Sequence, residues 1–536
     1  MHDASTPAAR FHRLLSRWRL PLLGIALAHF IAVHYFVLGF VTWDGLGHRV
    51  PPVVELVQHS SYGLDKYANW ALVNFHPFIE LLNAPFLWAL GQDGLIFAFA
   101  VTLFPACIVA VYLFVRELTG DERAAFYSAV TYVCIPLINA QVFSGHVDWA
   151  IPGLLAFYLH SLLVLGREHA PRPRALAYVR LGLAVCCFTM ARQQGLYLSV
   201  AFLAIVGYPI FVSRCRLRFS LKNKPVLVRA VLALAIGITP AVAVQILSFV
   251  RYGSPIYPYR FELFGLKLGN GMPMSTLFQI GGLSEYSLRG FWKATQAAYF
   301  VPARWPYCFF DGRNFGDSIF VLTALAGLPL TIPRMNRRTR VLLVSFVVLS
   351  LALKDFWQPR YAYGLLTSIC ICNGIAIAAL LERHRLGLTY ATCIVVLGLH
   401  ALRPEWDAWR LREGDFYPRI NVTGSKAFIT GNGDVPMFPD RNARILVVRA
   451  PGNSFILPLY GRKLTNSVVT SVAMKPDEGV GPRCEVVRAY TDQDPEMLVV
   501  DDEDLTKHCP RTCVLDGGWR CMAFKMQPDA SAQPAP

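Results

Sequence analysis

An acid stands where the first apolar run of the chain ends. Asp44, in Trp43-Asp44-Gly45, is the only acid between Asp3 and Glu55. A negative charge is unfavourable after a helix C-terminus, so helix packing gives little reason for a carboxylate at this position. A carboxylate within hydrogen-bond reach of a substrate hydroxyl or amine acts as a general base. Asp44 is therefore the first candidate for a catalytic group.

Further polar side chains stand at the ends of later apolar runs. They are Asp148, Arg192, Gln193, Lys354 and Arg360. Arginine and lysine suit a site where a phosphate gains negative charge, because they supply positive charge and fixed donors. Each group also has a structural alternative. The arginines fit snorkelling or ion-paired helix ends, and Asp148 fits an acid favoured at the start of its own helix.

The elements that must position these groups are long and apolar. The chain has 536 residues, of which 54% are hydrophobic and 16% are charged. Soluble proteins carry about 25% charged residues, and apolar runs of about 20 residues are typical of transmembrane helices. The net charge of +16 does not indicate nucleic-acid binding, because the Lys and Arg residues lie in short loops between the runs. We therefore expect a polytopic protein embedded in the lipid bilayer.

About eleven apolar runs predict an all-α membrane domain over residues 20–402, after a cytoplasmic N-terminus at 1–19. The predicted spans are Leu20–Val41, Leu95–Val115, Ala124–Ala140, Trp149–Leu165, Ala175–Ala191, Leu196–Val212, Ala230–Val250, Ile319–Ile332, Val341–Leu353, Tyr361–Leu381 and Leu386–Leu402. The eighth and ninth are short for a bilayer core of about 30 Å. A re-entrant hairpin there would leave later segments on the same side.

Basic residues sort the connecting loops into two sides. Nearly every short loop on one side is Arg-rich, as in 116–123 and 334–340, so that side is predicted to be cytoplasmic. The opposite side receives the long loops 42–94 and 251–317 and the tail 403–536. Long loops of this kind are usually functional. We expect a multi-pass plasma membrane protein, the inner membrane in a bacterium, with its active site facing the periplasm or the outside.

The tail 403–536 differs in composition from the membrane domain. Its short apolar runs predict buried strands of a small extracytoplasmic α/β domain, at Ile445–Val448, Phe455–Leu459 and Met497–Val500. Its cysteines, Cys484, Cys509, Cys513 and Cys521, predict two disulfides in an oxidising compartment, with three pairings open. Zinc binding by His508 with three of these cysteines is the alternative.

Several short motifs occur in order along the chain. They are Asp44 after the first span, Phe75-His76-Pro77-Phe78, the turn Arg116–Ala125 before an Ala-rich helix that ends at Pro136, Asp148, Tyr252-Gly253-Ser254-Pro255-Ile256-Tyr257-Pro258, and Gln358-Pro359-Arg360-Tyr361. In this order they resemble the GT-C superfamily of polyprenyl-phosphate-sugar-dependent glycosyltransferases. The nearest in appearance are protein O-mannosyltransferases and lipid A aminoarabinose transferases. The resemblance covers about the first 400 residues.

The resemblance implies an enzyme that transfers a hexosyl or pentosyl group from a lipid-linked donor to a glycan, glycolipid or protein acceptor. Asp44 would be the general base, and Asp148 would bind sugar hydroxyls or orient that base. Residues expected at the donor phosphate are Arg192, Arg360 and Lys354. Residues expected at the sugar are Trp43, His76, Gln193 and Tyr361, with the interfacial aromatic belt as the alternative role of the aromatic ones.

Metal dependence is left open by one departure from the family pattern. Many members carry two adjacent acids in the first loop, whereas Asp44 is followed by Gly45 and the next acid is Glu55. A divalent cation prefers several oxygen ligands, and Asp44 with Asp148 supplies only two side chains. A divalent metal at this pair is thus one alternative, and no other cofactor is expected.

Two alternative functions share the predicted architecture. A surface-glycan polymerase or ligase would take a lipid-pyrophosphate oligosaccharide as its donor. A transporter or flippase would place charge near the membrane midplane and show internal repeats with broken helices. No repeat is evident in the sequence, and the candidate polar groups stand at the ends of the predicted spans.

Overall fold

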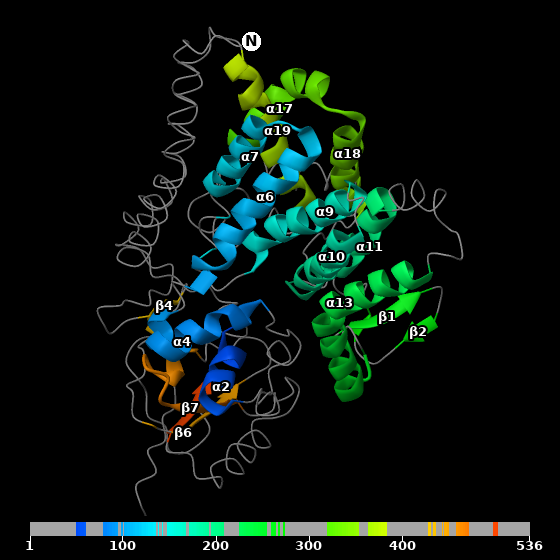
Figure 1. The fold of residues 1–536 in the computed structure, drawn as a ribbon. Coiled ribbons are helices and arrows are strands. Elements are labelled where there is room, and N and C mark those ends of the chain that lie inside the picture. The colour runs from blue at the N-terminus through cyan, green and yellow to red at the C-terminus, as the bar shows by residue number, and fades with distance from the viewer. Residues whose placement is uncertain are drawn as a thin grey trace, which may run out of the picture. The chain divides into compact units, whose positions relative to one another are not determined.

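The chain forms two compact units in a computed structural model (Figure 1). The structure describes residues 50–60, 79–94, 98–99, 101–135, 138, 142, 147–167, 171–191, 194–207, 224–254, 259–263, 266–268, 272–273, 319–352, 363–382, 427–429, 433–435, 442, 444–449, 457–470 and 497–501. The helical unit comprises Met1–His29, Ala100–Val142 and Val147–Trp406. The mixed unit comprises Phe30–Phe99, Phe143–His146 and Asp407–Pro536.

The helical unit is built from packed helices with apolar sequences. They are α6 (Leu103–Thr119), α7 (Glu122–Cys134), α9 (Ile151–Arg167), α10 (Pro171–Ala191), α11 (Gln194–Phe202), α13 (Lys224–Tyr252), α17 (Ile319–Thr331), α18 (Arg337–Ala352) and α19 (Tyr363–Glu382). Helix α6 packs against α7 and α9, α7 and α17 pack against α19, and α10 packs against α13 (Figure 1). A short 3-10 turn, η6 (Asp148–Ala150), leads directly into α9.

Glycines allow the closest of these helix crossings. A Cβ atom at Gly182 of α10 would overlap the Leu234 carbonyl oxygen of α13, and one at Gly237 of α13 would overlap the Val179 carbonyl oxygen of α10. Small residues at such crossings let helix backbones approach closely, which is how helices associate where water is absent. The pair Gly182 and Gly237 therefore fixes the crossing of α10 and α13.

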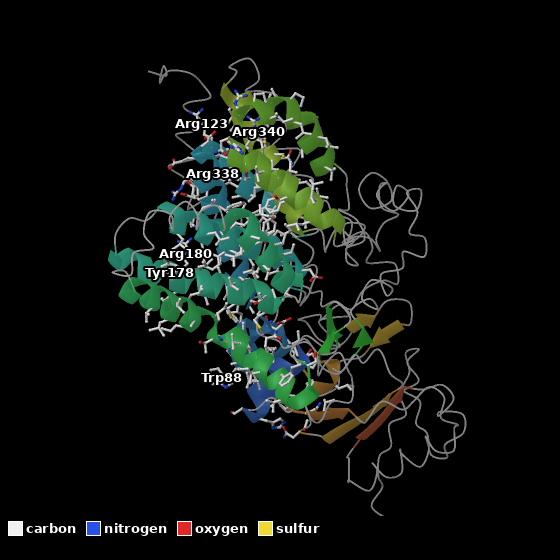
Figure 2. All side chains as sticks on the ribbon, turned by 90° about the vertical axis from the view of Figure 1, so that its right-hand side faces the viewer. Trp88, Arg123, Tyr178, Arg180, Arg338 and Arg340 are labelled. Carbon is white, nitrogen blue, oxygen red and sulfur yellow. The ribbon has the colours of Figure 1, made fainter. Side chains whose placement is uncertain are left out.

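The connection between α6 and α7 lies beside the start of α18. Asp121 caps α7 by accepting a hydrogen bond from the Arg123 backbone N–H at 2.8 Å. Asn336, just before α18, donates to the Leu118 carbonyl oxygen at the end of α6, at 2.8 Å. Two of the Arg-rich loops are thus joined, and Figure 2 shows Arg123 and Arg338 at the same end of the helical unit.

Much of the helix surface is apolar and exposed. Exposed side chains on α13 and α18 are Val231, Leu232, Ile236, Val242, Ile246, Phe249, Val341, Val344, Val347 and Val348. Among the described residues, the segments Asp148–Leu165 and Gly364–Leu381 are long and apolar enough to cross a membrane, and shorter apolar helices cover Leu176–Ala191, Leu198–Gly207 and Val231–Ile246. Large exposed apolar surfaces mark contact with a membrane or a protein partner, and the exposed apolar side chains of α13 and α18 agree with the predicted contact with the bilayer core.

The predicted spans from Leu95–Val115 to Tyr361–Leu381 each overlap a described helix. The first and last predicted spans, Leu20–Val41 and Leu386–Leu402, lie outside the described residues. Helix α13 starts at Lys224, before the predicted Ala230, because hydropathy marks the apolar centre of a helix and not its polar ends. At 13 residues, α17 is about 20 Å long, which agrees with the short span expected there.

The long loop after α13 contains three short strands. Strand β1 (Tyr259–Leu263) pairs antiparallel with β2 (Leu266–Leu268) and parallel with β3 (Met272–Pro273). The expectation of an all-α membrane domain is therefore incomplete at this loop, where Tyr259 and Phe261 supply the aromatic residues that favour strands.

The mixed unit joins helices from the first long loop with strands from the tail. Its helical elements are α2 (Pro51–His59), η4 (Glu80–Asn83), α4 (Ala84–Leu90) and η5 (Gly91–Gly94). In the tail, β6 (Arg444–Arg449) lies between β7 (Ser467–Thr470) and β8 (Met497–Asp501), parallel to both. A separate hairpin pairs β4 (Ala427–Ile429) with β5 (Gly433–Val435).

The predicted strands at Ile445–Val448 and Met497–Val500 lie within β6 and β8. The strand predicted at Phe455–Leu459 is wrong for its described part, where Leu457–Tyr460 forms the 3-10 turn η13. Pro458 explains the difference, because proline fixes φ near −65° and has no N–H to donate to a neighbouring strand.

Candidate functional site

Asp148 is buried at the start of the helix that it was predicted to open. It is 1% exposed and is the first residue of η6, which continues into α9. Val147 takes the N-cap position, so Asp148 lies in the first turn, where the helix macrodipole stabilises a negative charge. A buried carboxylate is nonetheless costly unless polar partners surround it.

The backbone beside Asp148 is held by two neighbouring helices. The Tyr132 hydroxyl of α7 donates to the Trp149 carbonyl oxygen at 2.9 Å, and the Cys107 thiol of α6 lies 3.6 Å from the Ala150 carbonyl oxygen. Phe104 of α6 packs edge-on against the Trp149 ring, with ring centroids 5.8 Å apart. The position of Asp148 is therefore fixed by packed side chains of α6 and α7.

This site lies at the end of the helical unit opposite the Arg-rich turns. Phe104 and Tyr132, which contact Trp149, lie near the start of α6 and the end of α7. The Arg-rich turn lies at the other ends of these two helices, at Arg116 and Arg123. Along α6 the two ends are separated by about 18 Å, at a rise of about 1.5 Å per residue. Asp148 and the basic turns are thus at opposite ends.

The other predicted site residues lie outside the described residues. They are Asp44, Trp43, His76, Arg192, Gln193, Lys354, Arg360 and Tyr361, together with Cys484, Cys509, Cys513 and Cys521 of the predicted disulfides. Their roles stay predictions. Helix α10 ends at Ala191 and α11 begins at Gln194, so Arg192 and Gln193 come between two described helices in the sequence.

One ionisable pair lies within the helices and not at their ends. Arg180, at the middle of α10, hydrogen-bonds the Nδ1 atom of His160 at the middle of α9. Its guanidinium also lies over the Phe157 ring, 5.5 Å from the centroid. The expectation that candidate polar groups stand at helix ends is therefore incomplete. A guanidinium has only donors, so Nδ1 accepts, and a neutral His160 ring carries its proton on Nε2.

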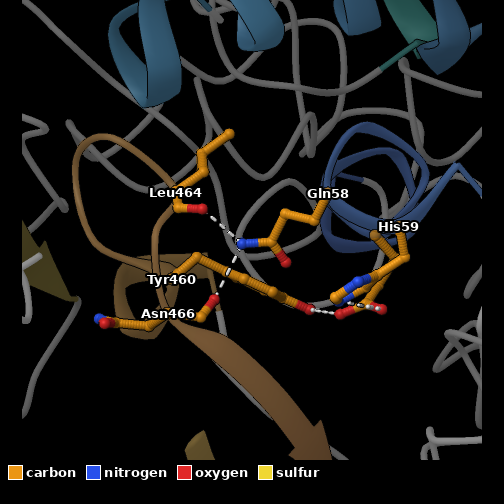
Figure 3. Close-up of polar contacts among 6 residues, drawn as sticks. Gln58, His59, Tyr460, Leu464 and Asn466 are labelled. Carbon is orange, nitrogen blue, oxygen red and sulfur yellow. Dashed lines mark hydrogen bonds and ion pairs between the residues drawn. The ribbon is translucent and has the colours of Figure 1, made fainter. Parts of the chain in front are cut away.

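A second buried polar cluster lies in the mixed unit, and sequence reasoning missed it. The Tyr460 hydroxyl donates to Glu55 Oε1 at 2.9 Å, and both side chains are fully buried (Figure 3). His59 Nε2, one helical turn after Glu55, lies 3.8 Å from Glu55 Oε2. In the sequence, Glu55 stands out only as an acid that follows the apolar residues Pro51-Pro52-Val53-Val54, and this pattern does not identify its partner in the tail.

Two glutamines extend this cluster to the backbone of the tail. The Gln58 side-chain amide donates to the Leu464 and Asn466 carbonyl oxygens, the latter at 2.9 Å (Figure 3). The Gln92 side-chain amide donates to the Gly461 carbonyl oxygen, also at 2.9 Å. We call these residues, with Glu55 and Tyr460, the loop–tail cluster.

No protein-family profile and no curated protein sequence matches the chain. Among the residues that the structure describes, no three His, Cys, Asp or Glu side chains gather in a way that would hold a metal ion. The predicted pair Asp44 and Asp148 falls outside that test, because Asp44 is not described.

Solved structures do match. The apo crystal structure of ArnT from Cupriavidus metallidurans is 12% identical with a TM-score of 0.53, covering 95% of this chain and 98% of that one. ArnT from the same organism bound to undecaprenyl phosphate is 14% identical with a TM-score of 0.43, covering 97% and 100%. An oligosaccharyltransferase from Archaeoglobus fulgidus tethered with an acceptor peptide is 14% identical with a TM-score of 0.44, covering 90% and 69%.

Only the first of these matches has a TM-score above 0.5, and at 12% identity it shows a likeness of fold alone. ArnT is a lipid A aminoarabinose transferase of the GT-C superfamily, the superfamily whose motif order the sequence resembles. The match spans nearly the whole of both chains. The chain therefore has a fold similar to that of this ArnT structure, and the resemblance drawn from its motifs is confirmed at the level of the fold.

Proposed function

We propose that the chain is a membrane glycosyltransferase that moves a sugar from a polyprenyl-phosphate donor to an extracytoplasmic acceptor. One observation carries the proposal: in a chain with a fold similar to that of ArnT, Asp148 is buried and held in place at the helix end opposite the Arg-rich turns. Basic loops face the cytoplasm in membrane proteins. On that rule Asp148 faces the periplasm or the outside, where the acceptor is found.

The proposed reaction is a substitution at the anomeric carbon of the donor sugar. The acceptor oxygen or nitrogen forms a bond to that carbon, and its proton passes to the Asp44 carboxylate. The bond between the anomeric carbon and the phosphate oxygen breaks, and the electron pair leaves with the polyprenyl phosphate. Asp148 binds sugar hydroxyls or orients Asp44, and its fixed position removes the need to reorganise during the reaction.

The leaving phosphate carries additional negative charge in the transition state. Arg192, Arg360 and Lys354 are the residues proposed to stabilise it, because preorganised cations lower the energy of developing negative charge. Trp43, His76, Gln193 and Tyr361 are proposed to contact the sugar. The alternative to general-base catalysis without a metal is a divalent ion bound by Asp44 and Asp148. This alternative predicts that a chelator abolishes sugar transfer.

The test uses Asp44→Asn and Asp148→Asn variants in membranes supplied with labelled polyprenyl-phosphate sugars. Each variant is expected to lose about 100-fold or more of the transfer rate, since it removes a group that acts on the reacting atoms. Arg123→Gln, in the basic turn at the other end of the helices, is the matched control and should keep its rate. Transfer that persists in both Asp variants would refute the proposal.

The sugar and the acceptor are to be identified separately. Mass spectrometry of envelope glycolipids and glycoproteins from a deletion strain should show the loss of one sugar modification. A deletion strain that instead accumulates unpolymerised lipid-pyrophosphate oligosaccharide would favour the polymerase or ligase alternative.

A further inference from the structure

The loop–tail cluster joins two segments that lie about 400 residues apart in the chain. We propose that the tail turn at 457–466 is a positioning element of the transferase. Through Glu55, Gln58 and Gln92 it holds the first long loop, and so fixes the segment that carries Asp44. Glu55 and Tyr460 are positioning residues in this proposal, which rests on the proposed function.

Breaking the hydrogen bond between Tyr460 and Glu55 is expected to cost a large part of the stability of this unit. Glu55 and Tyr460 are both 0% exposed, and the Tyr460 hydroxyl donates directly to the Glu55 carboxylate. Hydrogen bonds to an ionised acceptor are about twice as strong as those between neutral groups. Removing one partner leaves a buried polar group without its bond, which costs more than the bond contributes. The tail turn and α2 are therefore expected to stay together.

The remaining contacts recognise the backbone shape of the turn. Gln58 and Gln92 donate to the carbonyl oxygens of Leu464, Asn466 and Gly461, and the Gln92 N–H donates to the Arg462 carbonyl oxygen at 2.9 Å. Side-chain amides can reach these oxygens only if the turn holds one conformation. The contacts therefore select a folded turn and not merely its sequence.

Internal hydrogen bonds give the turn that conformation. The Asn466 side-chain amide donates to the Leu459 carbonyl oxygen at 3.0 Å, and the Asn466 N–H donates to the Tyr460 carbonyl oxygen at 3.1 Å. Leu464 adopts a φ of +58°, which is unfavourable for a branched apolar side chain. Such a conformation persists only where surrounding contacts impose it, and it is commonest at functional sites.

Close approach of the two segments depends on a glycine of the loop. Gly91, at the start of η5, has a φ of +63°, and a Cβ atom there would overlap the Arg462 carbonyl oxygen. Both segments therefore have a backbone conformation that fits the contact, at Gly91 in the loop and at Leu464 in the tail. A flexible tether would not need this fit, so the arrangement favours a fixed docking site.

The docked loop lies close in sequence to the proposed base. Helix α2 begins at Pro51, seven positions after Asp44, so the two are within about 25 Å even for an extended chain. Pro51 and Pro52 are buried and restrict the backbone at the helix start. A shift of α2 would therefore be passed to the segment before it, and a displacement of about 1 Å of a catalytic group can cost up to 100-fold in rate.

The test is the kinetics of the full-length enzyme in lipid nanodiscs. Tyr460→Phe, which removes only the hydroxyl, is expected to lower kcat about tenfold with a donor KM within about twofold of the wild type, because the base is displaced while donor binding remains. Glu55→Leu should match it, whereas Glu55→Gln keeps an oxygen that accepts from Tyr460 and should retain most of kcat. The double variant Glu55→Leu/Tyr460→Phe should be no slower than Glu55→Leu, because the hydrogen bond between the two residues is already lost in that single variant.

Tyr158→Phe is the matched control. It removes a hydroxyl that donates to the Ser199 carbonyl oxygen at 2.7 Å in the helical unit, so it should lower stability without lowering kcat of the folded enzyme. Equal kcat values for Tyr460→Phe and the wild type, or an equal fall in Tyr158→Phe, would overturn the positioning role.

Hydrogen exchange separates this outcome from a failure of the proposed function. Tyr460→Phe should speed amide exchange in α2, and Tyr158→Phe should not. If the wild type transfers no sugar from any polyprenyl-phosphate donor, the proposed function fails, and the exchange result still decides whether the tail holds α2. If the wild type is active but α2 exchanges at the same rate in Tyr460→Phe, the positioning proposal fails alone.

Discussion

The guanidinium of Arg180 is a polar group that the sequence analysis did not single out. It lies at the middle of α10, bonded to His160 and packed over Phe157. A charge at the centre of a membrane helix costs about 3 kcal/mol on insertion scales, and such groups usually pair with one another. The transporter alternative would use this pair as part of a transport path. The packing of the Arg180 guanidinium over the Phe157 ring favours a structural role instead, in which Arg180 holds α10 against α9.

Arg180→Met is therefore expected to destabilise the protein while leaving catalysis intact. Loss of a hydrogen bond from a charged donor costs about 1.5–3 kcal/mol, so the thermal midpoint in detergent should fall by several degrees. The transfer rate per folded molecule should stay within about twofold, because Arg180 is remote in the helices from the end that carries Asp148. Arg338→Met, at an exposed position, is the control and should change neither quantity. Unchanged stability with lost transfer would contradict the structural role.

At the scale of elements, two close helix crossings explain how an apolar sequence specifies one arrangement. In lipid, apolar side chains gain little by packing on one another in place of lipid tails, so backbone approach and shape decide which helices pair. Gly182 and Gly237 allow that approach between α10 and α13, and Gly374 of α19 does so against Ser128 of α7. Hydropathy alone finds the helices but says nothing of these pairings.

Gly237→Val should separate α10 from α13. Its branched side chain would overlap the Val179 backbone, and overpacking of this kind typically costs about 1–3 kcal/mol. We expect a lower yield of folded protein and a lower thermal midpoint. Ala235→Val adds similar bulk to the same helix at an exposed position and should be neutral. A Gly237→Val protein as stable as the Ala235→Val protein would show that the crossing does not depend on the glycine.

At the scale of the whole molecule, the sequence was informative where local pattern and fold coincide. An acid directly before an apolar run predicted that Asp148 begins a helix, because a negative charge is favoured at a helix start. The apolar run Phe455–Leu459 predicts a strand, whereas its described part is a 3-10 turn, because Pro458 cannot donate to a neighbouring strand. The hydrogen bond between Glu55 and Tyr460 could not be predicted from the sequence, because it joins segments about 400 residues apart and no local pattern links their side chains.

The membrane topology of the whole chain gives the last prediction. Arg338 and Trp88 are both exposed, Trp88 by 78%; the first belongs to an Arg-rich turn and the second to the first long loop. The excess of basic residues assigns the turn to the cytoplasm and the loop to the outside. Trp88→Cys should therefore react with a membrane-impermeant maleimide in intact cells or spheroplasts. Arg338→Cys should react only in inverted vesicles, with the wild-type chain as the background for its own cysteines. Labelling of both positions from one side would contradict the predicted alternation of spans, and with it the proposal that the active site faces the outside.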